Sequence, residues 1–270
     1  MMRPSRTEQL INYVVLTLFA AGALLPIVRI LVLSLQPQSF GGEGALHFEN
    51  YAAAWEQGRF SVYIRNSIVV SLLVVSVALV LSIASGYVLG VLRPRGEKIL
   101  FFTFLLGIMV PSEAIVLPLF FDLRSLGLTD TIWAIALPQI AQSLAFGTFW
   151  MRAFFRSVDR SLIEAAQLDG AGNLRILRSV LVPIAVPTVV TQVVLTFMWT
   201  WNDFLIPLVM SPSGKMRTAP LGLAFFQGQY TQGSSLLAAG AVLVALPMVI
   251  LYFALQRHFM AGITDGAVKG

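Results

Sequence analysis

The chain has 270 residues, of which 57% are hydrophobic and only 11% are charged, and its mean hydropathy is +0.81. Soluble domains carry about a quarter of their residues as charges, so this composition excludes a water-covered surface and indicates lipid as a solvent. The isoelectric point is near 9.9, but the basic residues lie in short segments between apolar runs, which argues against a nucleic-acid-binding face. The sequence has no cysteine, and His47 and His258 lack ligand spacing, so no metal site is expected.

Six apolar runs are long enough to cross a bilayer as helices, which takes about 20 residues each. They lie roughly at residues 10–35, 67–92, 99–121, 132–150, 186–209 and 236–255. The first run is longer than the core of a secretory signal, so we expect a retained anchor. No repeat and no long linker divides the sequence. We therefore predict an all-α integral membrane protein with a single transmembrane domain over residues 1–270.

The distribution of Lys and Arg predicts the orientation. With the N-terminus in the cytoplasm, the inner segments hold twelve of these residues and the outer segments five, and Arg29 in the first run completes the 18. The excess of positive charge on the inner side predicts that both termini are cytoplasmic. Arg29 lies late in its run, and we expect its side chain to extend to the membrane interface.

The longest inner segment, residues 156–187, separates the fourth and fifth runs. Ser161 and Glu164 have the spacing of a capping box, which predicts a short helix through Leu168. The stretch from Asp169 to Gly172 then predicts a tight turn, with Gly170 permitting it.

A second short helix is expected after that turn. Asn173 can cap a helix over residues 174–182, and Pro183 is expected to end it. The apolar side chains between Leu162 and Leu168 form a small surface suited to a groove on another protein. The alternative is a plain amphipathic helix pair at the membrane surface, in which Glu164 only caps.

The string EAAQLDGA, followed by Pro183, resembles the EAA motif of permease subunits of binding-protein-dependent ABC importers. In that family the segment is a coupling helix that docks into a cleft of the ATP-binding subunit. The resemblance thus assigns coupling to the ATPase to Glu164, Ala165, Ala166, Leu168, Asp169, Gly170, Ala171 and Pro183.

Three further stretches narrow the resemblance to the carbohydrate branch of the family. They are FENYAAAW followed by YIRNS, WNDFLIPL, and the tail QRHFMAGITDGAVKG over residues 256–270. Together they resemble the shorter six-helix permease of the maltose-type importers. This implies the six-helix permease fold of type I importers and a heterodimer with a second permease. The implied location is a bacterial or archaeal plasma membrane.

The resemblance also implies two ATP-binding subunits and an extracytoplasmic sugar-binding protein. The sequence contains no G-x-x-x-x-G-K followed by Ser or Thr, so no phosphate-binding loop of that type is present. We therefore expect no cofactor on this chain, and ATP and Mg on the partner ATPases. The chain itself is expected to be non-catalytic, moving between inward-open and outward-open arrangements.

A solute path is predicted from polar residues within apolar runs. Such groups are costly in lipid and are expected to face the bundle interior or a water-filled cavity. Trp201 and Phe204 could add aromatic surface for a sugar ring. The alternative is polar contact between helices with aromatic residues near the interface. The candidate path residues are Glu113, Gln139, Gln142, Trp199, Asn202 and Asp203.

Two further sets of contacts follow from the resemblance, one in the C-terminal tail and one in an outer loop. The tail of the family's shorter permease reaches the ATPases, which implies contacts by Thr264, Gly266, Lys269 and Gly270, although a frayed end is the alternative. The outer loop over residues 211–235 resembles one that probes the binding protein, and its candidate contacts are Gln227, Gln229 and Tyr230.

Two other functions remain open at this point. A secondary transporter driven by an ion gradient would use intramembrane ionisable pairs, for which only Glu113 and Asp203 are candidates. A membrane-embedded enzyme would need a nucleophile or metal cluster, which the sequence does not offer.

Overall fold

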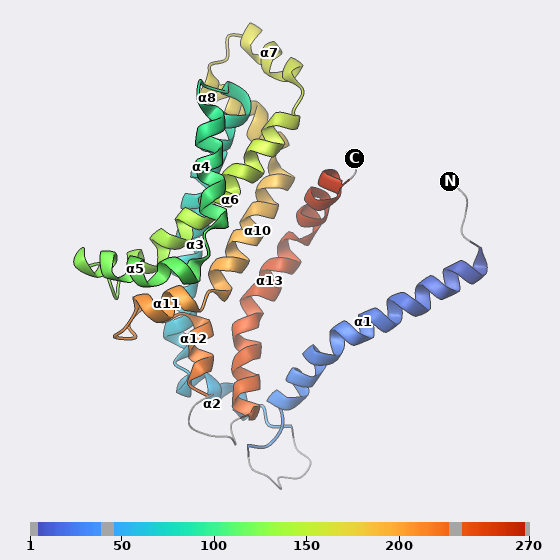
Figure 1. Ribbon diagram of the computed structural model, residues 1–270. Coiled ribbons are helices and arrows are strands. Elements are labelled where there is room, and N and C mark those ends of the chain that lie inside the picture. Colours follow the sequence, from blue (N-terminus) through green and yellow to red (C-terminus); the bar gives the residue numbers. More distant parts are fainter. Residues whose placement is uncertain (1–4, 39–45, 227–233, 268–270) are drawn as a thin grey trace. The chain divides into compact units, whose positions relative to one another are not determined.

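A computed structural model describes residues 5–38, 46–226 and 234–267 of the protein, with side chains as far as Gln256. Within these ranges all the regular structure is helical (Figure 1). The chain divides into two compact units, which are described separately. The first comprises Met1–Ser61 and Gly222–Leu246, and the second comprises Val62–Leu221 and Pro247–Gly270. The single domain expected from the sequence remains a prediction.

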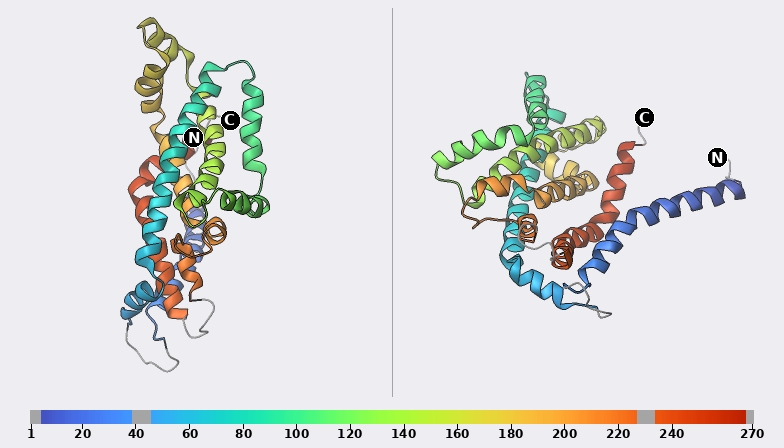
Figure 2. Two further views of the ribbon diagram at one scale, coloured as in Figure 1. Left: turned by 90° about the vertical axis from the view of Figure 1, so that its left-hand side faces the viewer. Right: turned by 60° about the horizontal axis from the view of Figure 1, so that its bottom comes forward.

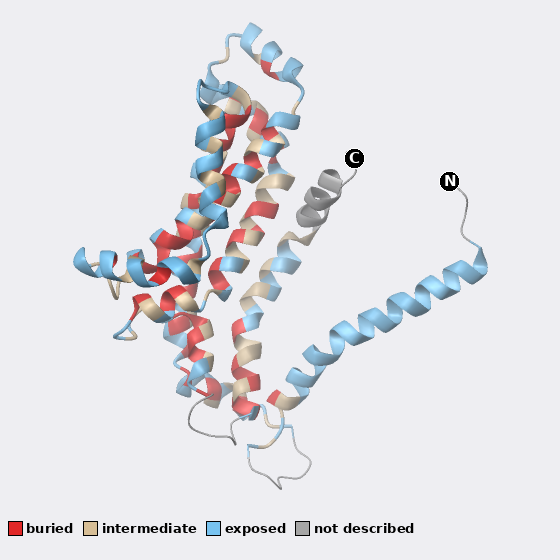
Figure 3. Cartoon of the chain, viewed as in Figure 1, coloured by how far each residue is buried: buried red, intermediate tan, exposed pale blue. Residues whose placement is uncertain are grey.

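In the first unit, α1 (Arg6–Ser34) begins with a capping box. Ser5 Oγ accepts from the Glu8 amide at 3.2 Å, and Glu8 Oε2 accepts from the Ser5 amide at 2.7 Å. Almost every residue of this apolar helix is exposed, as Figure 3 shows, and Ser34 at its end is buried. A helix that is hydrophobic all round and exposed along its length is suited to lipid or to another membrane protein.

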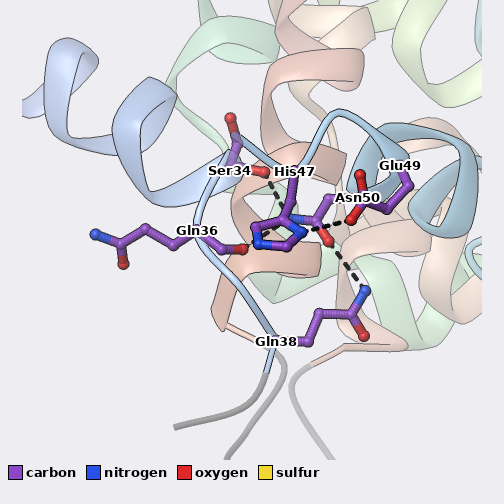
Figure 4. Close-up of polar contacts among 6 residues, drawn as sticks. All are labelled: Ser34, Gln36, Gln38, His47, Glu49 and Asn50. Carbon is purple, nitrogen blue, oxygen red and sulfur yellow. Dashed lines mark hydrogen bonds and ion pairs between the residues drawn. The ribbon is translucent and has the colours of Figure 1, made fainter. Parts of the chain in front are cut away.

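A buried asparagine fixes the end of α1 to α2 (Glu49–Gln57). Asn50 Nδ2 donates to the carbonyls of Ser34, at 2.9 Å, and Gln36, at 2.8 Å, and its Oδ1 accepts from Gln38 Nε2 at 3.0 Å (Figure 4). The Ser34 hydroxyl also bonds to the Tyr51 hydroxyl at 2.7 Å. These bonds satisfy carbonyls that the helix end leaves without partners, so the turn after α1 is well defined.

The second unit contains the helices that carry the candidate sites. Its main helices are α3 (Phe60–Tyr87), continued by the π-helical turn η1 (Val88–Leu92), α4 (Glu97–Met109), α5 (Ser112–Ser125), α6 (Ile132–Ser157), α10 (Val186–Asn202) and α11 (Leu205–Met210). The segment between α6 and α10 contains α7 (Arg160–Leu168), α8 (Asn173–Ile176), the π-helical turn η2 (Leu177–Leu181) and α9 (Val182–Ile184). Both α12 (Ala219–Ala224) and α13 (Ser234–Ala267) extend across the boundary between the units.

Four helical segments of the described ranges are long and apolar enough to cross a membrane, and the number rises to as many as six if each of two bent helix pairs is counted as one span. The bent pairs are α4 with α5, at 96°, and the residues 173–184 with α10, at 79°. The third predicted span is thus not straight, and Figure 2 shows α5 leaving the end of α4 at a steep angle. Val110 and Pro111 are extended at the break, because a residue before proline avoids the helical region and proline lacks an amide hydrogen.

Close packing of α6 against α3 and η1 depends on two glycines spaced four apart. A Cβ on Gly86 would lie 2.6 Å from Met151 Cβ, and one on Gly90 would lie 3.0 Å from Phe155 Cβ. This is the small-residue spacing that lets membrane helices approach closely. The core around α3, α5, α6 and α11 is otherwise aliphatic, and its buried members include Val70, Val74, Val116, Ile135, Ile206 and Met210.

Candidate functional site

The loop helix α7 starts two residues earlier than the capping box at Ser161 suggested. Its N-cap is Asp159, whose Oδ1 accepts from the Ser161 amide at 3.0 Å. The capping box predicted for Ser161 and Glu164 is therefore wrong, because the carboxylate two residues before Ser161 already occupies the capping position. The backbone bond from Ser161, followed by its side chain, lowers the pKa of Asp159. Glu164 is exposed, and its carboxylate takes no part in the cap.

The turn after α7 is a Schellman motif centred on Gly170, which has a φ of +76°. The Gly170 amide donates to the Gln167 carbonyl at 2.9 Å, and the Ala171 amide donates to the Ala166 carbonyl, also at 2.9 Å. Glycine adopts this left-handed conformation without the steric cost that a Cβ adds. The turn expected at Gly170 is present, and its two bonds reverse the chain within a few residues.

The second helix of the loop differs from the prediction at both ends. It begins at Asn173, but the preceding Gly172 is the N-cap and no side chain caps the helix. Asn173 Oδ1 instead accepts from the Tyr87 hydroxyl at 3.4 Å. Pro183 does not end the helix: it lies in the first turn of α9, where proline is tolerated, and the sharp bend comes at Ala185.

One face of α7 is held by the protein's own core. Ile163 is only 9% exposed and packs with a cluster that includes Tyr87, Met151 and Phe155, and Ala166 packs against the same cluster. At 3.6 residues per turn, the opposite face presents Glu164, Ala165 and Leu168.

These three residues are exposed, and Leu168 is 90% exposed. The coupling residues predicted from the sequence therefore fall into two groups. Ala166 and Ala171 face inwards as partly buried residues, whereas Glu164, Ala165, Leu168, Asp169, Gly170 and Pro183 are exposed.

All six candidate path residues line one pocket in the second unit, with a volume of about 520 Å³. Gln139 and Gln142 come from α6, Trp199 and Asn202 from the end of α10, and Glu113 from the first turn of α5. Asp203 lies at the break between α10 and α11. The pocket thus forms where two apolar runs are interrupted, which is where irregular backbone at membrane depth is tolerated.

A hydrogen-bond network holds Asp203 in the pocket wall. Its Oδ2 accepts from Gln139 Nε2 at 2.5 Å. Its Oδ1 accepts from the amides of Leu205, at 3.1 Å, and Ile206, at 3.4 Å, and so caps the start of α11. Asn202 Nδ2 donates to the Met198 carbonyl at 2.9 Å. Gln139 is 4% exposed, and its Oε1 has no partner in the described part of the chain.

Only one of the three aromatic residues expected at the path lines the pocket. Trp199 does, whereas Trp201 is buried and stacks on Phe197, and Phe204 is not part of the lining. Phe146 was not expected from the sequence, yet it lines the pocket and meets Trp199 edge-to-face, with ring centroids 4.8 Å apart. Phe146 follows Gln142 by four residues, and this helical spacing was the available signal.

The remaining predicted contacts cannot be placed by their side chains. The backbone of Thr264 and Gly266 lies within α13, beyond the described side chains. Lys269 and Gly270, and the outer-loop residues Gln227, Gln229 and Tyr230, lie outside the described residues.

The family model "Binding-protein-dependent transport system inner membrane component" matches residues 78–265. The chain belongs to this family. It is 36% identical over 261 residues to the trehalose transport system permease protein SugB of Mycobacterium tuberculosis, covering 94% of this chain and 95% of the relative. It is 28% identical over 274 residues to the maltodextrin transport system permease protein MdxG of Bacillus subtilis, covering 98% of this chain and 99% of the relative.

A solved member of the same fold is a bacterial ABC transporter involved in the import of the acidic polysaccharide alginate. It matches with a TM-score of 0.76 and 25% identity, covering 96% of this chain and all of that chain. The expectation of an ABC importer permease fold is confirmed, as is that of a permease of this family.

In this family member one helix, α6, contributes both to the pocket and to the cluster that holds the loop. Helix α6 supplies pocket residues from Gln139 onwards and, further along, contributes Met151 and Phe155 to the cluster around Ile163. The 13 residues from Gln142 to Phe155 span about 20 Å of helix. In Figure 1, α7 lies at the far end of α6 from α5 and α11. A rigid displacement of α7 would therefore act on a helix that also forms part of the pocket.

Proposed function

We propose that this chain is the permease subunit of an ATP-driven importer of sugars, oligosaccharides or related polyols and glycosides. The observation that carries the proposal is the family match over most of the chain, together with 36% identity to a trehalose permease along nearly the full length of both proteins. The relatives named for maltodextrin and arabinooligosaccharide transport support sugars as the substrate class.

The proposed assembly has four kinds of partner. A second permease completes the path, two ATP-binding subunits supply energy, and an extracytoplasmic sugar-binding protein delivers the solute. Membrane lipid surrounds the helices of a bacterial or archaeal plasma membrane. The excess of Lys and Arg in the inner segments supports cytoplasmic termini. In this proposal the chain hydrolyses no ATP itself.

Coupling is proposed to occur through the exposed face of α7. Glu164, Ala165 and Leu168 would contact the ATPase, and the exposed leucine gives that face an apolar anchor outside the membrane. Ile163 on the opposite face would transmit the movement to the cluster shared with α3 and α6. Closure of the ATPases would then shift the permease between its two arrangements as a rigid-body change.

Solute is proposed to pass the pocket lined by Glu113, Gln139, Gln142, Trp199, Asn202 and Asp203. A pocket with a few convergent polar groups and an aromatic wall is the usual form of a small-molecule site. Hydroxyl groups of a sugar can donate to the carboxylates and amides, and the Trp199 ring offers an apolar surface. The tail residues Thr264, Gly266, Lys269 and Gly270 remain proposed ATPase contacts, and Gln227, Gln229 and Tyr230 proposed binding-protein contacts.

A matched pair of charge substitutions tests the coupling role. Glu164→Lys places a lysine on the exposed face, whereas Gln167→Lys places one on the flank, one turn from Ile163. In the reconstituted complex, we expect Glu164→Lys to abolish most ATPase stimulation by sugar-loaded binding protein and Gln167→Lys to retain most of it. Normal stimulation in the Glu164→Lys complex would contradict the proposed docking face.

A further inference from the structure

The pocket in the second unit is lined by two carboxylates and by no basic side chain. Glu113 and Asp203 are both part of the wall, and no Lys, Arg or His is among the lining residues. The partners of Asp203 are the Gln139 amide and two backbone amides, all of which are uncharged donors. Its negative charge is therefore held in place by hydrogen bonds, and no cation of the described residues forms an ion pair with it.

The unused hydrogen-bonding groups of the wall include acceptors. Gln139 Nε2 is engaged with Asp203 and Asn202 Nδ2 with the Met198 carbonyl. Gln139 Oε1 is buried without a partner in the described residues, on a side chain only 4% exposed. The Glu113 carboxylate is exposed in the same wall, and an ionised carboxylate accepts hydrogen bonds and donates none, so this wall favours a ligand that brings hydroxyl hydrogens.

From the pocket we propose that this chain makes its part of the path selective by charge, accepting neutral, hydroxyl-rich solutes and repelling carboxylate-bearing sugars such as uronates. This inference rests on the proposed function. The fold alone does not set such a preference, because the solved transporter of the same fold is involved in the import of an acidic polysaccharide. The selective groups are Glu113 and Asp203, and Gln139 positions the latter.

The absence of cysteine from the sequence allows a direct test. Gln142→Cys places a single thiol of this chain in the pocket wall. The full importer in lipid nanodiscs, with its partner permease and ATPases, is treated with methanethiosulfonates carrying either a trimethylammonium or a sulfonate group. Labelling rates are read by mass spectrometry on the peptide that contains position 142 and are normalised to the rates with 2-mercaptoethanol.

We expect the cationic reagent to react at least about tenfold faster than the anionic one at low ionic strength, since charged clefts change local concentrations by about 10–1000-fold. The ratio should fall as salt is added. It should approach 1 in the Glu113→Gln, Asp203→Asn background, where the asparagine Oδ1 can still accept from the α11 amides. Glu56→Gln, an exposed acid outside the pocket lining, should leave the ratio unchanged.

A ratio near 1 in the parent background, or one that survives neutralisation of both carboxylates, would overturn the inference. So would a thiol at position 142 that reacts with neither reagent, since a pocket closed to small ions in the working complex is no solute path. The labelling uses neither sugar nor ATP. If the labelling result contradicts the charge preference, sugar import is still tested separately by uptake. If uptake fails, the charge preference can still be measured by labelling.

Discussion

Truncation of Ile163 tests how α7 is held on the permease. The side chain is 9% exposed and packs on the cluster of Tyr87, Met151 and Phe155. Removing three buried carbons by Ile163→Ala costs about 2–5 kcal/mol in well-packed cores. Since Ile163 lies at the edge of its cluster, we take the lower figure of about 2 kcal/mol, which corresponds to about a 30-fold rise in the undocked population of α7.

Amide hydrogen exchange measures this population directly. In the permease pair in nanodiscs, without ATPases, we expect the amides of residues 164–168 to exchange about 30-fold faster in Ile163→Ala than in the parent protein. Leu162→Ala is the matched control, because it removes an aliphatic side chain of the same size from an exposed position of the same helix. Its effect should stay within about twofold, as for other surface substitutions.

Equal acceleration in the two variants would contradict the packing described for Ile163. No acceleration in either variant would mean that α7 is held by other contacts. In the complete importer, Ile163→Ala should also weaken ATPase stimulation while the ATPases still bind, because the contact face of α7 remains intact.

Three further predictions concern local structure. Gly170→Ala should lower the free energy of unfolding of the permease by roughly 1–2 kcal/mol in thermal unfolding, because the φ of Gly170 is +76°. Gly172→Ala, at the N-cap of α8 with an ordinary φ and free space around the added carbon, should lower it by less. In the same assay, Gly86→Ala should lower the free energy of unfolding by about 1–3 kcal/mol, because the added carbon overpacks against α6. Gly22→Ala, where the added carbon meets nothing within 4 Å, should leave that free energy unchanged. Burial opposes the charge of Asp130, but hydrogen bonds from the hydroxyls of Ser213 and Ser211 and from the Ser213 amide, with the charge of Lys215, lower its pKa below 3.8. The stabilisation by this carboxylate is therefore complete above its unfolded-state pKa and is lost as the pH falls through the lower folded-state pKa. The difference in unfolding temperature between the parent protein and Asp130→Asn should stay constant from pH 7 to about 5 and should shrink at lower pH.

The sequence predicted those parts of the structure that depend on local composition. Apolar length located the membrane segments, and Gly170 located the turn of the loop. The five polar candidates in apolar runs were expected to face the bundle interior or a water-filled cavity because lipid would solvate them poorly, and they line a common pocket with Trp199. That rule constrains where polar groups lie without requiring any knowledge of helix pairing.

The features that were missed depend on competition between signals or on tertiary contacts. Ser161 fits a capping box, yet Asp159 caps the helix, and the motif alone does not tell which of these two candidate N-caps is used. The break at Val110 was hidden by an apolar run that continues through it. The bond between Gln139 and Asp203 joins residues 64 positions apart, which no local pattern reveals. Gly86 and Gly90 did carry a readable signal for close helix packing.

Uptake by proteoliposomes tests the central claim most directly. The chain is reconstituted with its partner permease, the ATPases and the sugar-loaded binding protein, and accumulation of radiolabelled sugar is measured with and without ATP and ion gradients. We expect accumulation to require both ATP and the binding protein, and to be lost in the complex with Glu164→Lys. Accumulation driven by a proton or sodium gradient in the absence of ATP would contradict the account and identify the chain as an ion-coupled transporter.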